Sequence, residues 1–84
     1  MKVEKFLRMV DITNIGKVTI WSDESDLEPL WEGGDAFEIP WWIAKLKIGF
    51  KDAEDAKYDE PVRMNIYKNE YDVSLIELVI NVIE

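Results

Sequence analysis

The segment from Glu38 to Phe50 changes its hydrophobic period partway along, and this change limits the folds open to the chain. Pro40 suits the first turn of a helix, because its φ is fixed and it has no N–H to leave unpaired. The apolar residues nearby recur at helical spacing: Ile39, Trp42, Ile43 and Leu46. After them the apolar residues alternate with lysine and glycine, at Leu46, Ile48 and Phe50. The pattern predicts a short central helix over Pro40–Lys45 that runs into a strand over Leu46–Phe50.

Trp41 lies off the apolar stripe of this helix, about 200° around the axis from Ile39. Two neighbouring tryptophans on a helix cannot both face one core. Trp41 is then either a core residue covered by the N-terminal helix or an exposed aromatic that anchors a partner.

The N-terminal half of the chain predicts one helix and one hairpin. Residues Val3–Val10 carry apolar side chains at helical spacing, and Lys17–Ser22 alternates as a strand with Val18 and Ile20 on one face. A second strand is expected over Leu27–Glu32, antiparallel to the first. Because Pro29 cannot donate to a ladder, this strand lies at an edge or begins after the proline.

The C-terminal third contains one clear strand and one ambiguous segment. Pro61–Tyr67 alternates, with Val62, Met64 and Ile66 inward, and is expected to pair with Leu46–Phe50, while Lys51–Glu60 is a charged loop. In the last segment, Ser74 and Glu77 match a capping box, which favours a helix. The alternation of Ile76, Leu78, Ile80 and Val82 favours a strand instead. We predict the helix and keep the strand as the alternative.

These elements define an α+β fold in a single domain over residues 1–84. It comprises an N-terminal helix, an antiparallel sheet of about four strands, the short helix at Pro40–Lys45 and a C-terminal helix. The 84 residues are 48% hydrophobic, enough to fill one core, and dimerisation could stabilise so small a domain.

The composition disfavours several classes of function. The chain has no cysteine and no histidine, so neither a zinc site nor a thiolate nucleophile is expected. The acidic stretches lack the spacing of a calcium-binding EF-hand loop, and we expect no metal, no cofactor, no catalytic residue and no enzymatic activity. The net charge of −8 argues against direct binding to nucleic acid or to an anionic membrane surface. Without a signal peptide or a transmembrane run, a cytoplasmic location is expected.

The distribution of the acids is the most informative feature for function. From residue 23 to residue 38 there are seven carboxylates and no lysine or arginine, and a second acidic group follows over residues 52–60. Such a run can be a solvated face that only keeps the protein soluble. It can also imitate a phosphate backbone and, with aromatic side chains among the acids, bind a basic protein surface. The predicted partner-binding residues are Asp23, Glu24, Asp26, Glu28, Trp31, Glu32, Asp35, Glu38 and Trp41.

The segment from Trp31 to Ile43, WEGGDAFEIPWWI, followed by the strand at Leu46–Phe50, resembles a pattern in small acidic proteins of low-GC Gram-positive bacteria and their phages. In that pattern a hairpin with a Gly-acid break leads through an Ile-Pro step into a short helix and another strand. The resemblance transfers no site residues. It implies a mobile-element setting, in a bacterial host cell, where inhibitors of host defence of the anti-CRISPR or anti-restriction type are common.

We therefore expect a small acidic interaction protein that inhibits a basic, nucleic-acid-binding host protein. The alternative is a self-associating structural or assembly protein of a phage or mobile element, in which the tryptophans form the seam of a homo-oligomer.

Overall fold

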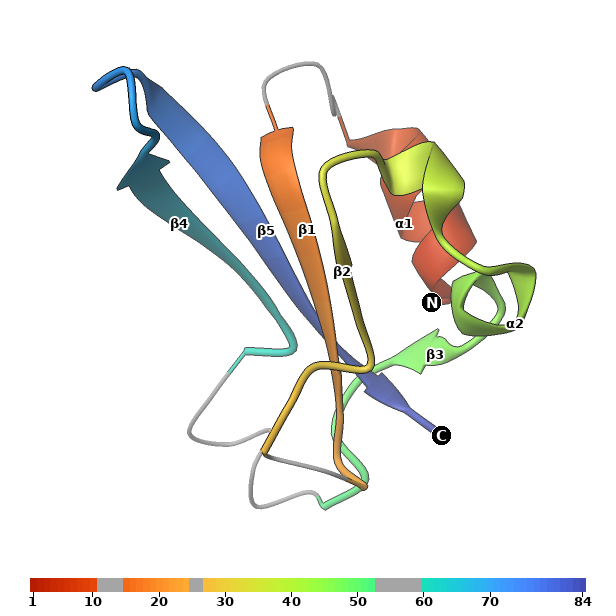
Figure 1. The fold of residues 1–84 in the computed structure, drawn as a ribbon. Coiled ribbons are helices and arrows are strands. Elements are labelled where there is room, and N and C mark those ends of the chain that lie inside the picture. Colours follow the sequence, from red (N-terminus) through yellow and green to blue (C-terminus); the bar gives the residue numbers. More distant parts are fainter. Residues whose placement is uncertain (11–14, 25–26, 53–59) are drawn as a thin grey trace.

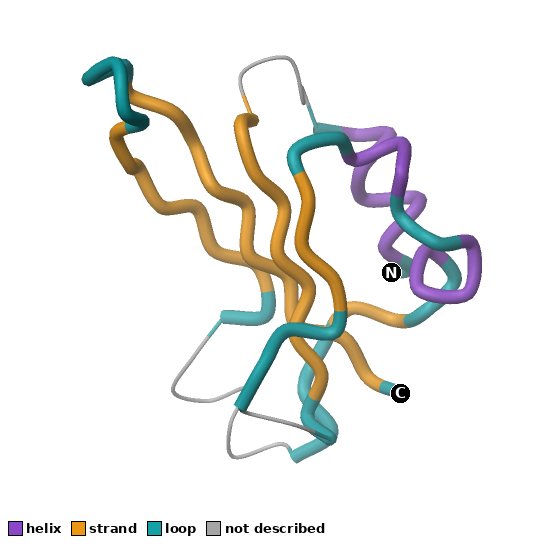
Figure 2. The backbone as a smooth tube through the Cα atoms, viewed as in Figure 1, coloured by secondary structure: helices purple, strands orange, loops and turns teal. Residues whose placement is uncertain are grey.

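The computed structural model describes residues 1–10, 15–24, 27–52 and 60–84, which form a sheet with helices on one side (Figures 1 and 2). The elements in chain order are helix α1 (Val3–Met9), strand β1 (Ile15–Ser22), strand β2 (Trp31–Gly33), the 3-10 helix η2 (Ala36–Glu38), helix α2 (Trp41–Ala44), strand β3 (Lys47–Ile48), strand β4 (Val62–Lys68) and strand β5 (Ser74–Ile83).

Strand β5 is the centre of the sheet. Along one edge it pairs in parallel with β1, in a register that sets Val18 beside Leu78 and Ile20 beside Ile80. Along its other edge it pairs antiparallel with β4 and, beyond the end of β4, with the short strand β3. The strand β2 pairs antiparallel with β1 and forms the far edge of the sheet.

The core lies between the sheet and the helices. Alternation along β1 and β5 directs Val18, Ile20, Leu78, Ile80 and Val82 to one face, where all of them are buried. Two buried side chains of the helical layer complete this cluster, Val3 of α1 and Ile43 of α2. The helices thus cover the part of the sheet near β1 and β2, whereas β4 extends away from them (Figure 1). The opposite face of the sheet carries no helix in the described part of the chain.

Two of the three predicted helices, the N-terminal and the central one, are confirmed, because the signals for both are local. Helix α1 begins at Val3 and buries it, with Phe6 and Leu7 packed against the same cluster. The N–H of Ala44 donates to the carbonyl of Pro40 at 3.0 Å, so α2 begins immediately after the proline. Ile43 is the buried residue of the predicted apolar stripe.

The predicted C-terminal helix is wrong, because Ser74–Ile83 is strand β5. A helix would have turned part of the apolar segment toward solvent, whereas the strand buries Leu78, Ile80 and Val82 on one face and satisfies its backbone on both edges. The alternation therefore outweighed the possible capping box at Ser74.

The predicted antiparallel sheet of about four strands is also corrected: the sheet is mixed and has five strands. The hairpin of β1 and β2 is confirmed, and β2 begins after Pro29 at an edge, as the proline requires. The strand expected over Leu46–Phe50 is only Lys47–Ile48, and it pairs with β5 rather than with β4. Strand β4 presents Met64 and Ile66 on the expected face, yet both are exposed, because no helix covers this strand.

Truncation of a leucine in β5 tests this assignment of the core. We expect Leu78→Ala to lower the free energy of unfolding by about 2–5 kcal/mol, because it leaves a cavity where Leu78 is fully buried. Leu27→Ala, the same change at a side chain that is 92% exposed, is expected to cost less than about 0.5 kcal/mol. Urea unfolding followed by tryptophan fluorescence measures both, and equal losses would contradict the described core.

Candidate functional site

Exposed carboxylates of two connections, β1–β2 and β3–β4, lie toward one end of the sheet, where β1 ends and β4 begins (the lower end in Figure 1). Asp23, Glu24 and Glu28 follow β1, Asp52 follows β3, and Glu60 precedes β4. We call these five residues the acidic loop end. Three of the five belong to the run over residues 23–38 that lacks lysine and arginine, and the other two belong to the second acidic group over residues 52–60.

Asn81, near the end of β5, joins these loops. Its side-chain Nδ2 donates to Asp23 Oδ1 and to the carbonyl of Gly49, both at 2.9 Å. Its backbone N–H donates to the carbonyl of Pro61 at 2.7 Å. One residue of the central strand therefore holds the loop after β1, the segment after β3 and the segment before β4 at fixed positions.

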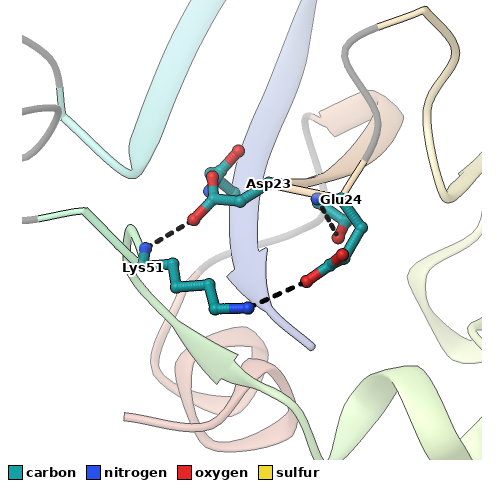
Figure 3. A network of polar contacts seen from close by, with 5 residues as sticks. Asp23, Glu24 and Lys51 are labelled. Atoms are coloured by element: carbon teal, nitrogen blue, oxygen red, sulfur yellow. Dashed lines mark hydrogen bonds and ion pairs between the residues drawn. The ribbon is translucent and has the colours of Figure 1, made fainter.

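Lys51 adds a second connection between the same loops (Figure 3). Its backbone N–H donates to Asp23 Oδ2, and its Nζ lies 3.1 Å from Glu24 Oε1. Within the turn itself, the N–H of Glu24 donates to Ser22 Oγ at 3.1 Å. Both partners of the Lys51–Glu24 pair are mostly exposed, so the pair contributes little to stability but limits where the Glu24 carboxylate lies.

The remaining predicted partner-binding residues lie elsewhere. Glu32 is on the uncovered face of the sheet, and Asp35 caps η2 by accepting the N–H of Phe37 at 2.9 Å. Glu38 is exposed on η2, and Asp26 lies outside the described residues. Trp31 is half-buried against the core, with its ring over Gly33. The structure thus brings together Asp23, Glu24 and Glu28 but not the whole run.

Three aromatic side chains form an exposed surface on η2 and α2. Phe37 is 86% exposed, Trp41 is 73% exposed and Trp42 is 46% exposed. The exposure of Trp41 follows from its position off the helical stripe, but Trp42, assigned to that stripe, is also partly exposed. The predicted partner-binding residues did not include Phe37, although it is one of the aromatic residues among the acids and the most exposed of the three.

A cleft of about 420 Å³ lies beside this aromatic surface, between α1 and the segment of η2 and α2. Leu7, Ile39 and Phe37 give it apolar walls, and Glu4 and Arg8 also line it. Among the described residues that line the cleft, Glu4 carries the one carboxylate.

The uncovered face of the sheet carries a small ionic cluster around Lys17. Its Nζ lies 2.9 Å from Glu32 Oε1 and 3.5 Å from Glu77 Oε2, and Thr19 Oγ1 donates to the same Glu77 oxygen at 3.0 Å. The hydrogen bond to Glu32 is the main reason why the pKa of Lys17 is raised above its ordinary value.

Within the described part of the chain, no three carboxylates are arranged to hold a metal ion. None of the helices among the described residues has the length and apolar character needed to cross a membrane. Comparison of the chain with protein-family models, curated proteins and solved structures found no match.

Two asparagine substitutions test how the acidic loop end is held. Asn81→Asp replaces the donating Nδ2 with an acceptor and sets a charge beside Asp23, so we expect it to cost about 1–3 kcal/mol at pH 7. Asn69 uses only its Oδ1, which accepts from the N–H groups of Tyr71 and Val73, so Asn69→Asp is the matched control and should be nearly neutral. Urea unfolding at pH 7 measures both, and equal costs would contradict the role of Asn81.

The Lys17 cluster predicts a dependence of stability on pH. Because its pKa is raised on folding, Lys17 stabilises the protein fully below its unfolded pKa of about 10.5, and the stabilisation is lost as pH rises through the folded-state value. The stability difference between the wild type and Lys17→Met should therefore be constant from pH 7 to about pH 9.5 and shrink above about pH 10.5. Urea unfolding across this range measures it, and a difference that grows with pH would refute the assignment.

Proposed function

We propose that the protein is a small acidic interaction module that binds a basic surface of another protein through its acidic loop end. The observation that supports this best is that two connections joined by Asn81 meet at one end of the sheet and carry five acids: Asp23, Glu24, Glu28, Asp52 and Glu60. When loops are held in place before a partner binds, less conformational entropy is lost on binding.

The distribution of charge also supports this function. Lys51 is the one cation among the described residues of these loops at that end, and it is already paired with Glu24. The chain as a whole carries −8, so a positively charged partner is attracted at long range and then meets a locally concentrated negative surface.

The class of partner follows from the same chemistry. Surfaces that bind nucleic acids are rich in lysine and arginine spaced to match phosphates, and grouped carboxylates can occupy such a surface. Together with the resemblance of the Trp31–Ile43 segment, this makes an inhibitor of a nucleic-acid-handling host protein, of the anti-CRISPR or anti-restriction type, the specific form of the proposal. Trp41 and Phe37 lie on other elements, so only a large partner could contact both surfaces.

Charge reversal with a matched control tests the function. The triple variant Glu28→Lys, Asp52→Lys, Glu60→Lys changes the acidic loop end and leaves Asp23 and its hydrogen bonds in place. The control variant Glu38→Lys, Glu70→Lys, Asp72→Lys changes three exposed acids away from that end of the sheet and has the same net charge. Circular dichroism verifies that both variants are folded.

The measurement is affinity capture from bacterial lysate, quantified by mass spectrometry, with and without double-stranded DNA as competitor. We expect the wild type and the control to retain proteins that DNA displaces, and the loop-end variant to lose them by at least about tenfold, as expected when several charge contacts are reversed. If both triple variants lost the captured proteins equally, the loss would come from the change in net charge alone, and the acidic loop end would have no specific role. Captured proteins that DNA cannot displace would count against a nucleic-acid-binding partner.

A further inference from the structure

Strand β4 is an edge strand with an apolar face that the fold does not cover. It pairs with β5 on one side, and among the described residues no strand pairs with its other side. Met64 is 57% exposed and Ile66 is 80% exposed. Both lie on the face of the sheet that carries the helices, but the helices do not reach as far as β4 (Figure 1). A seven-residue edge with exposed apolar side chains is a template for pairing with another strand.

The hydrogen bonds at the two ends of the β4–β5 ladder show which residues of β4 point outward. The N–H of Asn81 donates to Pro61 O at 2.7 Å, and the N–H of Asn69 donates to Val73 O at 3.1 Å. In an antiparallel ladder the hydrogen-bonded pairs alternate, so the odd-numbered residues of β4 face β5 with their backbone groups. The N–H and C=O groups of Val62, Met64, Ile66 and Lys68 therefore point to the open edge.

This arrangement is complementary to itself. An antiparallel pair of β4 strands that includes all of Val62–Lys68 from both copies has its twofold axis at Asn65. Met64 then lies opposite Ile66 of the other copy, and Val62 lies opposite Lys68, so each outward-pointing residue meets an outward-pointing residue. The backbone N–H and C=O groups that point outward on one copy can therefore hydrogen-bond to those of the other copy along the whole strand, without a bulge.

The side chains and charges are also compatible in this register. Met64 and Ile66 of both copies form one apolar cluster on the helix side, removing from water side chains that are exposed in the single chain. Arg63 lies opposite Tyr67, so no charged residue of the strand directly faces another. In a chain of net charge −8, β4 contains two cations and no acid, which makes it a segment where two copies can approach closely.

We infer that the outer edge of β4 binds a second copy of this chain, and that the homodimer has one continuous sheet through both copies. This surface is separate from the acidic loop end, and its partner differs from the basic protein proposed above. The seam contains no tryptophan, in contrast to the tryptophan seam of the alternative function considered from the sequence.

Sedimentation equilibrium over a range of protein concentrations tests the dimer. We expect the wild type to form dimers, more tightly at high salt because screening reduces the repulsion between two acidic chains. Ile66→Lys should raise the dimer dissociation constant by at least about tenfold, since it removes an apolar contact from each copy. Leu27→Lys makes a comparable change at an exposed leucine outside β4 and should leave the constant unchanged.

A cysteine cross-link tests the register. The chain has no cysteine of its own, and in the proposed pair the two Asn65 residues face each other in a non-hydrogen-bonded pair, where Cα atoms are about 4.5 Å apart. Mild oxidation of Asn65→Cys should give a covalent dimer on a non-reducing gel, whereas Arg63→Cys, one position along the same face, should not.

A wild type that stays monomeric at all concentrations would overturn the inference, as would a dimer equally weakened by Leu27→Lys. A dimer that cross-links through Arg63→Cys and not through Asn65→Cys would overturn the register. Weaker dimerisation at high salt would indicate a charge-driven contact instead, which also contradicts the β4 seam.

Discussion

The parallel pairing of β1 with β5 is the contact on which the rest of the structure depends. It sets Val18 and Ile20 beside Leu78 and Ile80, and burial of such side chains contributes about 1.5–3 kcal/mol each. The other elements attach to this pair: β2 to the free side of β1, β3 and β4 to the free side of β5, and the helices to the apolar face. In so small a chain this pair supplies most of the fully buried residues.

The direction of these strands also explains where the acidic residues meet. Because β1 and β5 are parallel, both end at the same end of the sheet, and the antiparallel strand β4 begins there. The connection from β1 to β2 and both ends of the connection from β3 to β4 are thereby brought together, although the two connections are far apart in the sequence. Asn81, at this end of β5, is placed to bind all three through one side chain and one backbone N–H.

Local signals in the sequence predicted the local elements, namely α1, α2 and the hairpin of β1 and β2. The C-terminal segment was mispredicted because Ser74 and Glu77 fit a helix cap, while the burial that favours a strand depends on β1, about sixty residues earlier. Non-local pairing likewise decides the site. Asp23 and Glu24 end β1 and reach the acidic loop end, but Glu32 lies within β2 and Asp35 beyond its far end, so a continuous run becomes divided in space.

The edge strands β2 and β4 differ in how readily another strand could pair with them. This difference connects the proposed dimer with the proposed binding of a basic protein. Strand β2 is an edge of only three residues, whereas β4 is an edge of seven residues with exposed apolar side chains at Met64 and Ile66. Antiparallel pairing through β4 would set the two acidic loop ends at opposite ends of the shared sheet. Their carboxylates would remain far apart, so dimerisation would not add to the repulsion within either site. A dimer built in this way would present two separate acidic surfaces, and on a partner that carries two basic sites the second binding event would benefit from the first.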